Sequence, residues 1–194
     1  MISIIVARYN EDVSWSKQFP NVTIYNKGVE LNDGYNELFL NNVGREGHTY
    51  YKYICDNYDN LSDYTIFLQG NPFDHTPDII SFLNKCIDNQ PSDNIQFGFL
   101  SDHIYHTDLT KESITYYQCV NIHKTWERVF NETINNASII FGAGGQFIVS
   151  KNTILKNTRE FYGNIVNILE YSVDPLEGYD IERFHHHIFT NFNN

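Results

Sequence analysis

The sequence predicts an α/β domain of three layers, in which helices cover a mostly parallel central sheet. Strand-like runs alternate with helix-like runs along the chain, as they do in proteins built from a sheet with helices packed on it. Hydrophobic residues make up 41% of the sequence, enough to bury a real core. The length of 194 residues predicts a single domain over residues 1–194, because domains usually hold about 100–200 residues.

The strands are predicted from short runs of β-branched and aromatic residues with turn-forming residues around them. Such runs occupy residues 2–7, 22–25, 64–68 and 96–100. A further apolar stretch over residues 138–149 is broken by Gly142-Ala143-Gly144-Gly145, which predicts a bend or bulge at that point.

Helical patterns lie between these strands. One helix is expected to open at Thr76-Pro77-Asp78, with Thr as the N-cap, Pro in the first turn and Asp facing the positive end of the helix dipole. Gly163 is a candidate break in the longest helix. The other helices are expected over residues 45–58, 124–134, 151–171 and 180–189.

Composition excludes several classes of protein. A formal net charge of −11 argues against a nucleic-acid partner, which needs a basic surface. No apolar run approaches the ~20 residues of a membrane span, and residues 1–6 read as a first strand instead of a signal peptide. Cys55, Cys86 and Cys119 form no CxxC pair and are expected to be free thiols. Together these features predict a soluble, cytoplasmic protein.

Polar and charged residues collect where the predicted strands end. Arg8 and Asn10 follow the first strand, and Gln69, Asn71 and Asp74 follow the third. Ligands of such sheets bind beyond the carboxyl ends of the strands. We therefore expect the ends of strands 2–7, 64–68 and 96–100 on one edge, with Arg8 and Asp74 in a common cleft. The alternative for Arg8 is a solvated turn with a surface ion pair.

Three further clusters carry chemically active side chains. Glycines flank Arg45 and Glu46 where a helix begins, a place suited to an anion, although ordinary capping explains the pair equally well. Glu182 and His186 lie four residues apart on one flank of the last helix, which suits metal binding or proton transfer. The histidines at 103 and 106 are better read as part of a polar loop.

Six segments of the sequence carry a family resemblance. They are "VARYNEDVSW", "YNKG", "NVGREGHTY", "DNYDNLSDYTIFLQGNPFDH", "GGQFIVS" and "ERFHHHIF". In this order they resemble a family of domains of unknown function that includes small GT-A-type glycosyltransferases of large DNA viruses. The resemblance implies a Rossmann-like, GT-A-like sheet and transfer of a sugar from a nucleoside-diphosphate sugar to a glycan or a protein hydroxyl, in the host cytoplasm if the protein is viral.

The resemblance also implies roles for particular residues. The donor diphosphate would lie against Ala7, Arg8, Asn10, Arg45, Gln69 and Asn71. GT-A enzymes usually hold Mn²⁺ or Mg²⁺ with a D-x-D motif, but Gln69-Gly70-Asn71 stands in that place here. Asp74 would then supply the carboxylate, with His186 as a second ligand. Asp180 or Glu182 would be the catalytic base of an inverting reaction, and residues 142–146 would form the acceptor side.

Two other functions compete with this one. A metal-dependent hydrolase would use Asp74-His75, Asp102-His103 and the histidines of the last helix as ligands of zinc or manganese. A non-catalytic sugar-nucleotide-binding module would keep the cleft without the metal motif, which Gln69 and Asn71 favour.

Overall fold

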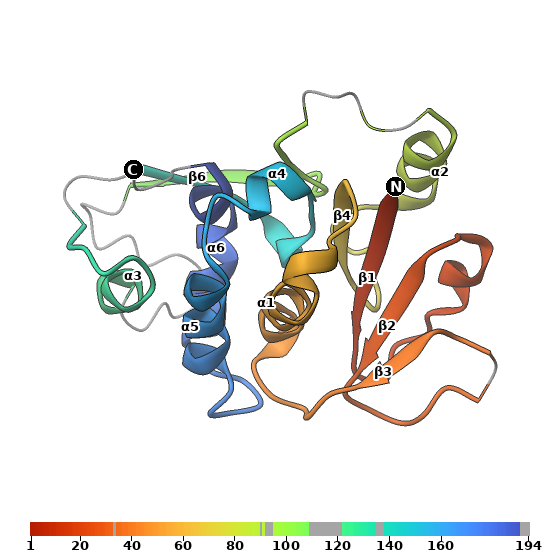
Figure 1. The fold of residues 1–194 in the computed structure, drawn as a ribbon, viewed down its shortest axis with the longest axis horizontal. Helices are drawn as coiled ribbons and strands as arrows, with labels where there is room; N and C mark the ends of the chain where they lie inside the picture. The colour runs from red at the N-terminus through yellow and green to blue at the C-terminus, as the bar shows by residue number, and fades with distance from the viewer. Residues whose placement is uncertain (33, 90, 92–94, 109–121, 135–137, 191–194) are drawn as a thin grey trace.

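A computed structural model describes residues 1–32, 34–89, 91, 95–108, 122–134 and 138–190 of the protein (Figure 1). Its main sheet has six strands in the order β3-β2-β1-β4-β8-β5. The strands of this sheet are β1 (Ile2–Arg8), β2 (Val22–Asn26), β3 (Glu37–Phe39), β4 (Tyr64–Gln69), β5 (Phe97–Phe99) and β8 (Phe147–Ser150).

The sheet is mixed, which corrects the prediction of a mostly parallel one. Strands β1, β2, β3 and β4 run parallel, whereas β8 runs antiparallel to both of its neighbours, β4 and β5. Because β5 is antiparallel to β8, it points the same way as β4. The carboxyl ends of β1, β4 and β5 therefore share one edge of the sheet, as the sequence predicts.

Helices pack on both faces of the sheet (Figure 1). Side chains alternate across β1, so that Ile5 faces one core while Ile4 and Val6 face the other. The first core includes residues of α1, α3, α5 and α6, and the second includes residues of α2. The helices are α1 (Arg45–Asn57), α2 (Ile79–Asn89), α3 (Ile122–Phe130), α4 (Lys151–Ile154), α5 (Arg159–Leu169) and α6 (Glu177–Thr190), with short 3-10 turns η1 (Ser14–Gln18), η2 (Tyr58–Asn60) and η3 (Ala143–Gly145).

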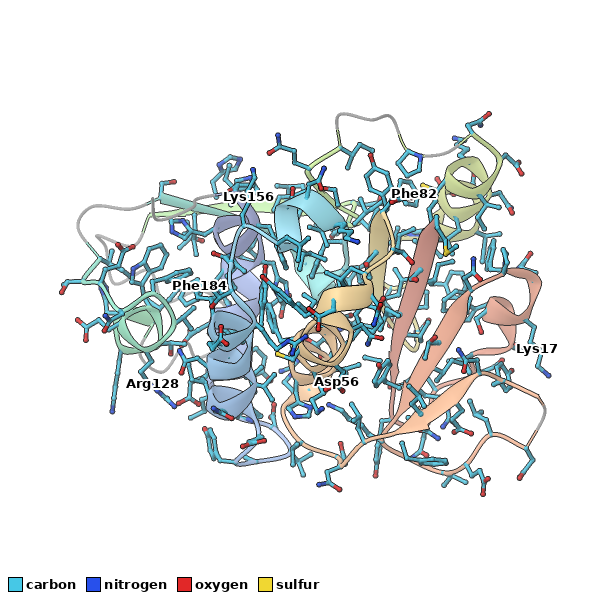
Figure 2. All side chains as sticks on the ribbon, viewed as in Figure 1. Lys17, Asp56, Phe82, Arg128, Lys156 and Phe184 are labelled. Carbon is cyan, nitrogen blue, oxygen red and sulfur yellow. The ribbon has the colours of Figure 1, made fainter. Side chains whose placement is uncertain are left out.

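Figure 2 shows how side chains divide between interior and surface. Phe184 of α6 is fully buried and meets the Trp126 ring of α3 edge-on, with 5.3 Å between the ring centroids. The labelled side chains of Lys17, Arg128 and Lys156 lie at the periphery of the molecule. Apolar rings thus join α3 to α6, while these three charged side chains stay in water.

A second, two-stranded sheet stands beside the main one. Its strands β6 (Ile104–Asp108) and β7 (Ser138–Gly142) pair antiparallel. The apolar stretch over residues 138–149 is therefore split, as predicted at its glycines, into β7, η3 and β8. The break lets one stretch of chain serve two sheets, and it brings η3 to the carboxyl edge of the main sheet.

Two predicted helices differ in the structure, one in where it begins and one in being divided. Thr76 does not cap α2, which begins at Ile79. The Thr76 hydroxyl instead donates to the Leu100 carbonyl and accepts from the Gln146 amide. The helix predicted over residues 151–171 is divided into α4 and α5 before Thr158, whose hydroxyl accepts from Phe161 N, and α5 continues through Gly163. N-capping by Thr158 therefore sets the break.

Two further predictions concern membrane-spanning segments and the cysteines. Among the residues that the structure describes, no helix is long and apolar enough to cross a membrane. Cys55 and Cys86 are free thiols, and Cys119 lies outside the described residues.

Candidate functional site

The candidate site lies where β1 and β4 end side by side. Ala7 and Gln69 are partners in the last rung of this parallel ladder. Beyond them opens a cavity of about 610 Å³, which we call the first cavity. It is lined by Ala7, Arg8, Tyr9, Glu11, Lys27, Asn42, Arg45, Glu46, Gln69, Asn71, Asp74, Val173 and Asp174.

The first cavity collects most of the predicted ligand-binding residues. Those it brings together are Ala7, Arg8, Arg45, Gln69, Asn71 and Asp74. The shared cleft expected for Arg8 and Asp74 is therefore present. Asn10 lies outside the lining, and its side-chain oxygen accepts from the Val29 amide at 3.0 Å. Asn10 thus holds the neighbouring loop.

Arg8 is more buried than a solvated turn residue, with 8% of its surface exposed. Its Nη1 donates to Asn26 Oδ1 at 2.8 Å and to the Val29 carbonyl at 2.7 Å. Its Nε donates to the Glu11 carbonyl at 2.9 Å. These bonds hold together the loops that follow β1 and β2, so that much of the hydrogen-bonding capacity of Arg8 is used within the protein.

The loop after β2 approaches this arginine closely because it contains Gly28. A Cβ atom at Gly28 would lie 1.5 Å from the Tyr9 carbonyl oxygen. No side chain fits there without moving the end of β1, and Tyr9 lines the first cavity. Gly28 is therefore required for the shape of this wall.

Arg45 begins α1 directly after Gly44, which has a left-handed backbone. Its guanidinium lies 4.1 Å from the centroid of the Tyr179 ring of α6. Ion pairs reach Asp174 at 3.4 Å and Glu46 at 3.7 Å. Arg45 is thus held from several sides, with 26% of its side chain exposed.

Lys27 is a cation of the first cavity that sequence reasoning missed. Its Nζ donates to the carbonyls of Val43 and Arg45, just before and at the start of α1. Burial lowers the pKa of the ammonium to about 8, although the charge of Glu46 acts in the opposite direction. The signal was present in the sequence, because Lys27 follows the strand predicted over residues 22–25 at the same edge of the sheet.

A second cavity, of about 780 Å³, adjoins the first. Arg45 and Gln69 line both cavities, so the two are neighbours across these side chains. The second cavity is lined by Arg45, Gln69, His75, His103, Tyr105, His106, Thr107, Phe141, Ala143, Gly144, Tyr179, Glu182 and Arg183. It therefore joins the η3 turn and the second sheet to the carboxyl edge of the main sheet.

Glu182 is the carboxyl group of the second cavity. Its Oε1 accepts from the backbone N–H of Gly144 at 3.0 Å. Burial, followed by the nearby charge of Glu46, raises its pKa to about 7, despite the opposing effects of Arg183 and Arg45. A carboxyl group with such a pKa can take up or release a proton near neutral pH.

Besides Asn10, two more predicted site residues lie outside both cavities. Asp180 is 1% exposed, and its Oδ2 accepts from the Thr125 hydroxyl at 2.6 Å. The His186 ring stacks on Phe99, with ring centroids 5.6 Å apart and planes at 24°. The structure therefore does not bring Asp180 to the cleft, nor His186 to Asp74. Helical spacing placed Glu182 and His186 on one flank, but α6 directs them to different surroundings.

A divalent cation would find few ligands here. Asp74 is exposed, and its Oδ2 accepts from the Asn71 amide at 3.0 Å. Within the described part of the chain, no group of three or more His, Cys, Asp or Glu residues is placed to hold a metal ion. Asp74 alone does not make a cation site, and a divalent ion bound there would need further oxygen ligands, for example from a bound phosphate.

The chain is thus an α/β protein with two adjoining cavities at the carboxyl edge of its parallel strands. The chain belongs to a family of proteins of unknown function, DUF3431, whose family model matches residues 4–194. This match confirms the predicted domain-of-unknown-function family, whereas the relation to viral glycosyltransferases stays a prediction. Neither a curated protein nor a solved structure matches the chain.

Proposed function

We propose that the protein is a glycosyltransferase that moves a sugar from a nucleoside-diphosphate sugar to a hydroxyl acceptor. The observation that carries the proposal is the pair of adjoining cavities, which share Arg45 and Gln69. Transfer between two substrates needs two binding places that meet at the reacting atoms. A site for a single small ligand has no need of the second chamber.

The donor is assigned to the first cavity. Arg45 and Lys27 line this cavity as half-buried cations, and charge-assisted hydrogen bonds to phosphate oxygens are among the stronger ones. Tyr9 is 51% exposed at the end of β1 and offers an aromatic face to a nucleobase. Asp74 would hold Mn²⁺ or Mg²⁺ together with the diphosphate, and the ion would offset the charge of the leaving group.

The acceptor is assigned to the second cavity, with Glu182 as the base. Glu182 takes the proton of the acceptor hydroxyl while the acceptor oxygen bonds to the anomeric carbon. The bond from that carbon to the diphosphate oxygen breaks, and the nucleoside diphosphate leaves with the electron pair. Of the two predicted bases, Glu182 is favoured because it lines the cavity, which Asp180 does not.

A thermal-shift screen of nucleoside-diphosphate sugars, with and without manganese, tests the donor. A ligand that binds the native state raises the melting temperature, so we expect one nucleotide class to do so. The matching nucleoside monophosphate is the control and should shift it less. The proposal fails if no nucleotide sugar changes the melting temperature under either condition.

A hydrolase is the second candidate, because three histidines line the second cavity. His75, His103 and His106 come from the loop after β4 and from the region of β6. The backbone N–H of Asp102 donates to the His75 carbonyl at 3.0 Å, so the two Asp-His segments do meet. Turnover of a generic phosphoester with zinc or manganese would favour this function. Nucleotide-sugar binding without any turnover would favour the non-catalytic module.

A further inference from the structure

The turn that opens α1 has an unusual backbone. Gly44 has a φ of 67° and Arg45 a φ of 52°, so two consecutive residues lie in the left-handed region. This region is ordinary for glycine but unfavourable for arginine, whose Cβ atom crowds the backbone there. A residue in such a conformation persists only where the surrounding structure holds it. Arg45 lines both cavities, so the groups that hold it also shape the candidate site.

One side of this turn is held by the loop that joins α5 to α6. The backbone N–H of Gly44 donates to the Ser172 carbonyl at 2.8 Å, and that of Arg45 donates to the Val173 carbonyl at 3.4 Å. Residue 44 has no room for a side chain, because a Cβ atom there would lie 2.5 Å from His48 Cβ. On this side the turn is therefore fixed through its N–H groups.

Lys27 holds the turn from the other side, through its carbonyl groups. The Nζ atom of Lys27 donates to the carbonyl oxygen of Val43 at 2.6 Å and also to that of Arg45. These two carbonyls flank Gly44, so one ammonium group spans the left-handed part of the chain. A lysine ammonium has three N–H donors, so at most one of them is left for a ligand. Most of the hydrogen-bonding capacity of Lys27 is thus used on the backbone that carries Arg45.

The direction of the Arg45 side chain depends on this backbone. Side-chain direction is coupled to the backbone conformation, so a right-handed Arg45 would point its side chain elsewhere. In the structure its stem passes Gly178 at the start of α6, where a Cβ atom would lie 3.2 Å from Arg45 Cδ. The guanidinium then lies over the Tyr179 ring. The left-handed backbone is therefore what brings Arg45 to the wall that the two cavities share.

We propose that Lys27 is a positioning residue that acts through Arg45. Its ammonium group holds Arg45 in the left-handed conformation that brings the guanidinium to the wall between the two cavities. When the ammonium is removed, the carbonyls of Val43 and Arg45 lose this donor, and Arg45 relaxes toward the right-handed conformation that arginine prefers. The guanidinium then leaves the Tyr179 ring. The hold itself does not depend on the proposed function, but its use in binding the donor diphosphate rests on it.

The first test reads the position of Arg45 by NMR of the full chain labelled with ¹⁵N. Protons over the face of an aromatic ring are shielded, so the Nε–H of Arg45 should give an upfield-shifted signal, assigned by its loss in Arg45→Gln. Lys27→Met should move this signal toward the position of a free arginine. Lys17→Met removes an exposed lysine outside both cavities and is the matched control, which should leave the signal in place. An unchanged signal in Lys27→Met, or the same change in both variants, overturns the proposal.

A second variant keeps this test decisive if Lys27→Met does not fold. Lys27→Gln has two N–H donors on a shorter side chain and carries no charge. It can replace only part of the hold, so the Arg45 signal should move in the same direction by a smaller amount. A signal that stays at its wild-type position in Lys27→Gln overturns the proposal in that case.

Binding of pyrophosphate, which carries the diphosphate group alone, shows whether Lys27 acts through Arg45. In the wild-type background Lys27→Met should lower the affinity about tenfold, as expected when a hydrogen bond to a charged group is lost. In the Arg45→Gln background the same substitution should lower it by no more than about twofold, because the residue through which Lys27 acts is gone. Equal losses in the two backgrounds would show that Lys27 binds the ligand directly, and they would overturn its role as a positioning residue in binding.

The two measurements separate this proposal from the proposed function. A wild-type protein that binds neither pyrophosphate nor any nucleotide refutes the donor site, while the Arg45 signal still decides whether Lys27 holds the turn. Nucleotide binding in a protein whose Arg45 signal ignores Lys27→Met refutes the hold and leaves the donor site.

Discussion

The guanidinium of Arg45 lies 4.1 Å from the centroid of the Tyr179 ring, and this contact ties the start of α1 to the start of α6. Arg45 lines both cavities, and Tyr179 lines the second. The arginine is therefore a structural link as well as a candidate ligand. Its effect on stability must be separated from its effect on binding.

Arg45→Gln should weaken nucleotide binding by about 10–100-fold, because a hydrogen bond to a charged group contributes roughly 1.5–3 kcal/mol. The loss of the contact with Tyr179 should cost about 1 kcal/mol of stability. Arg159→Gln is a matched control, because Arg159 pairs with Asp59 and lies 5.4 Å from the Tyr58 ring, outside both cavities. Calorimetry in which both variants bind equally well would remove Arg45 from the site.

The predicted metal site depends on the carboxylate of Asp74. Nucleotide and manganese should bind cooperatively, each improving the affinity of the other by the same factor. Asp74→Asn should abolish this coupling with little loss of stability, because the side chain is exposed. His186→Gln should leave the coupling intact, because His186 lies outside both cavities. Nucleotide binding that is indifferent to EDTA and to Asp74→Asn would establish a site in which cations of the protein hold the diphosphate alone.

The raised pKa of Glu182 predicts that the free energy of unfolding depends on pH. Its pKa is raised from the ordinary glutamate value of 4.5 to about 7, so between these values the native state holds a proton that the unfolded chain has released. Stability is therefore lost as pH rises through this window, and the loss is complete above the folded pKa.

Glu182→Gln removes this loss while keeping an acceptor for the Gly144 N–H. The variant should be more stable than the wild type by about 1–2 kcal/mol at about pH 8, after a discount for partial solvent screening. The difference should vanish below the unfolded pKa. Urea unfolding at both pH values measures it, and an equal difference at the two values would contradict the raised pKa.

Much of the fold could be predicted because its signals are local. The runs over residues 2–7 and 64–68 lie within β1 and β4, and the predicted helix over residues 45–58 matches α1 to within one residue. The direction of β8 could not be predicted, because it depends on where the chain re-enters the sheet after η3. β3 is a three-residue edge strand with exposed Leu38 and Phe39, too short for a periodic signal.

The strand-end rule predicted part of the lining of the first cavity. It located Arg8, Gln69 and Asp74, whose positions follow from parallel β1 and β4. It missed Lys27, which obeys the same rule after β2. Helical spacing alone could not decide that His186 packs on Phe99.

Buried histidines predict loss of stability in acid. Burial lowers the pKa of His48 to about 4, that of His185 to about 3 and that of His187 to about 4. For His48 the charges of Lys27 and Lys52 add to the effect, and for His187 that of His186 does. These rings are neutral in the native protein, whereas histidines of the unfolded chain take up protons near pH 6.5.

The stabilisation of the native state by these neutral histidines is therefore complete above the unfolded pKa, and it is lost as pH falls from about 6.5 toward about 4. The three histidines outweigh Glu182, whose effect on the slope is opposite. The free energy of unfolding should therefore fall as pH falls across this window, with a slope that corresponds to up to about two protons. Urea unfolding at a series of pH values measures the slope.

His185→Gln should be less stable at neutral pH, because it loses the 2.8 Å hydrogen bond with Tyr51, but its slope should be smaller by about one proton. His123→Gln, at an exposed position on α3, is the control and should keep the wild-type slope. Equal slopes in all three proteins would show that His185 does not govern the acid sensitivity of the fold.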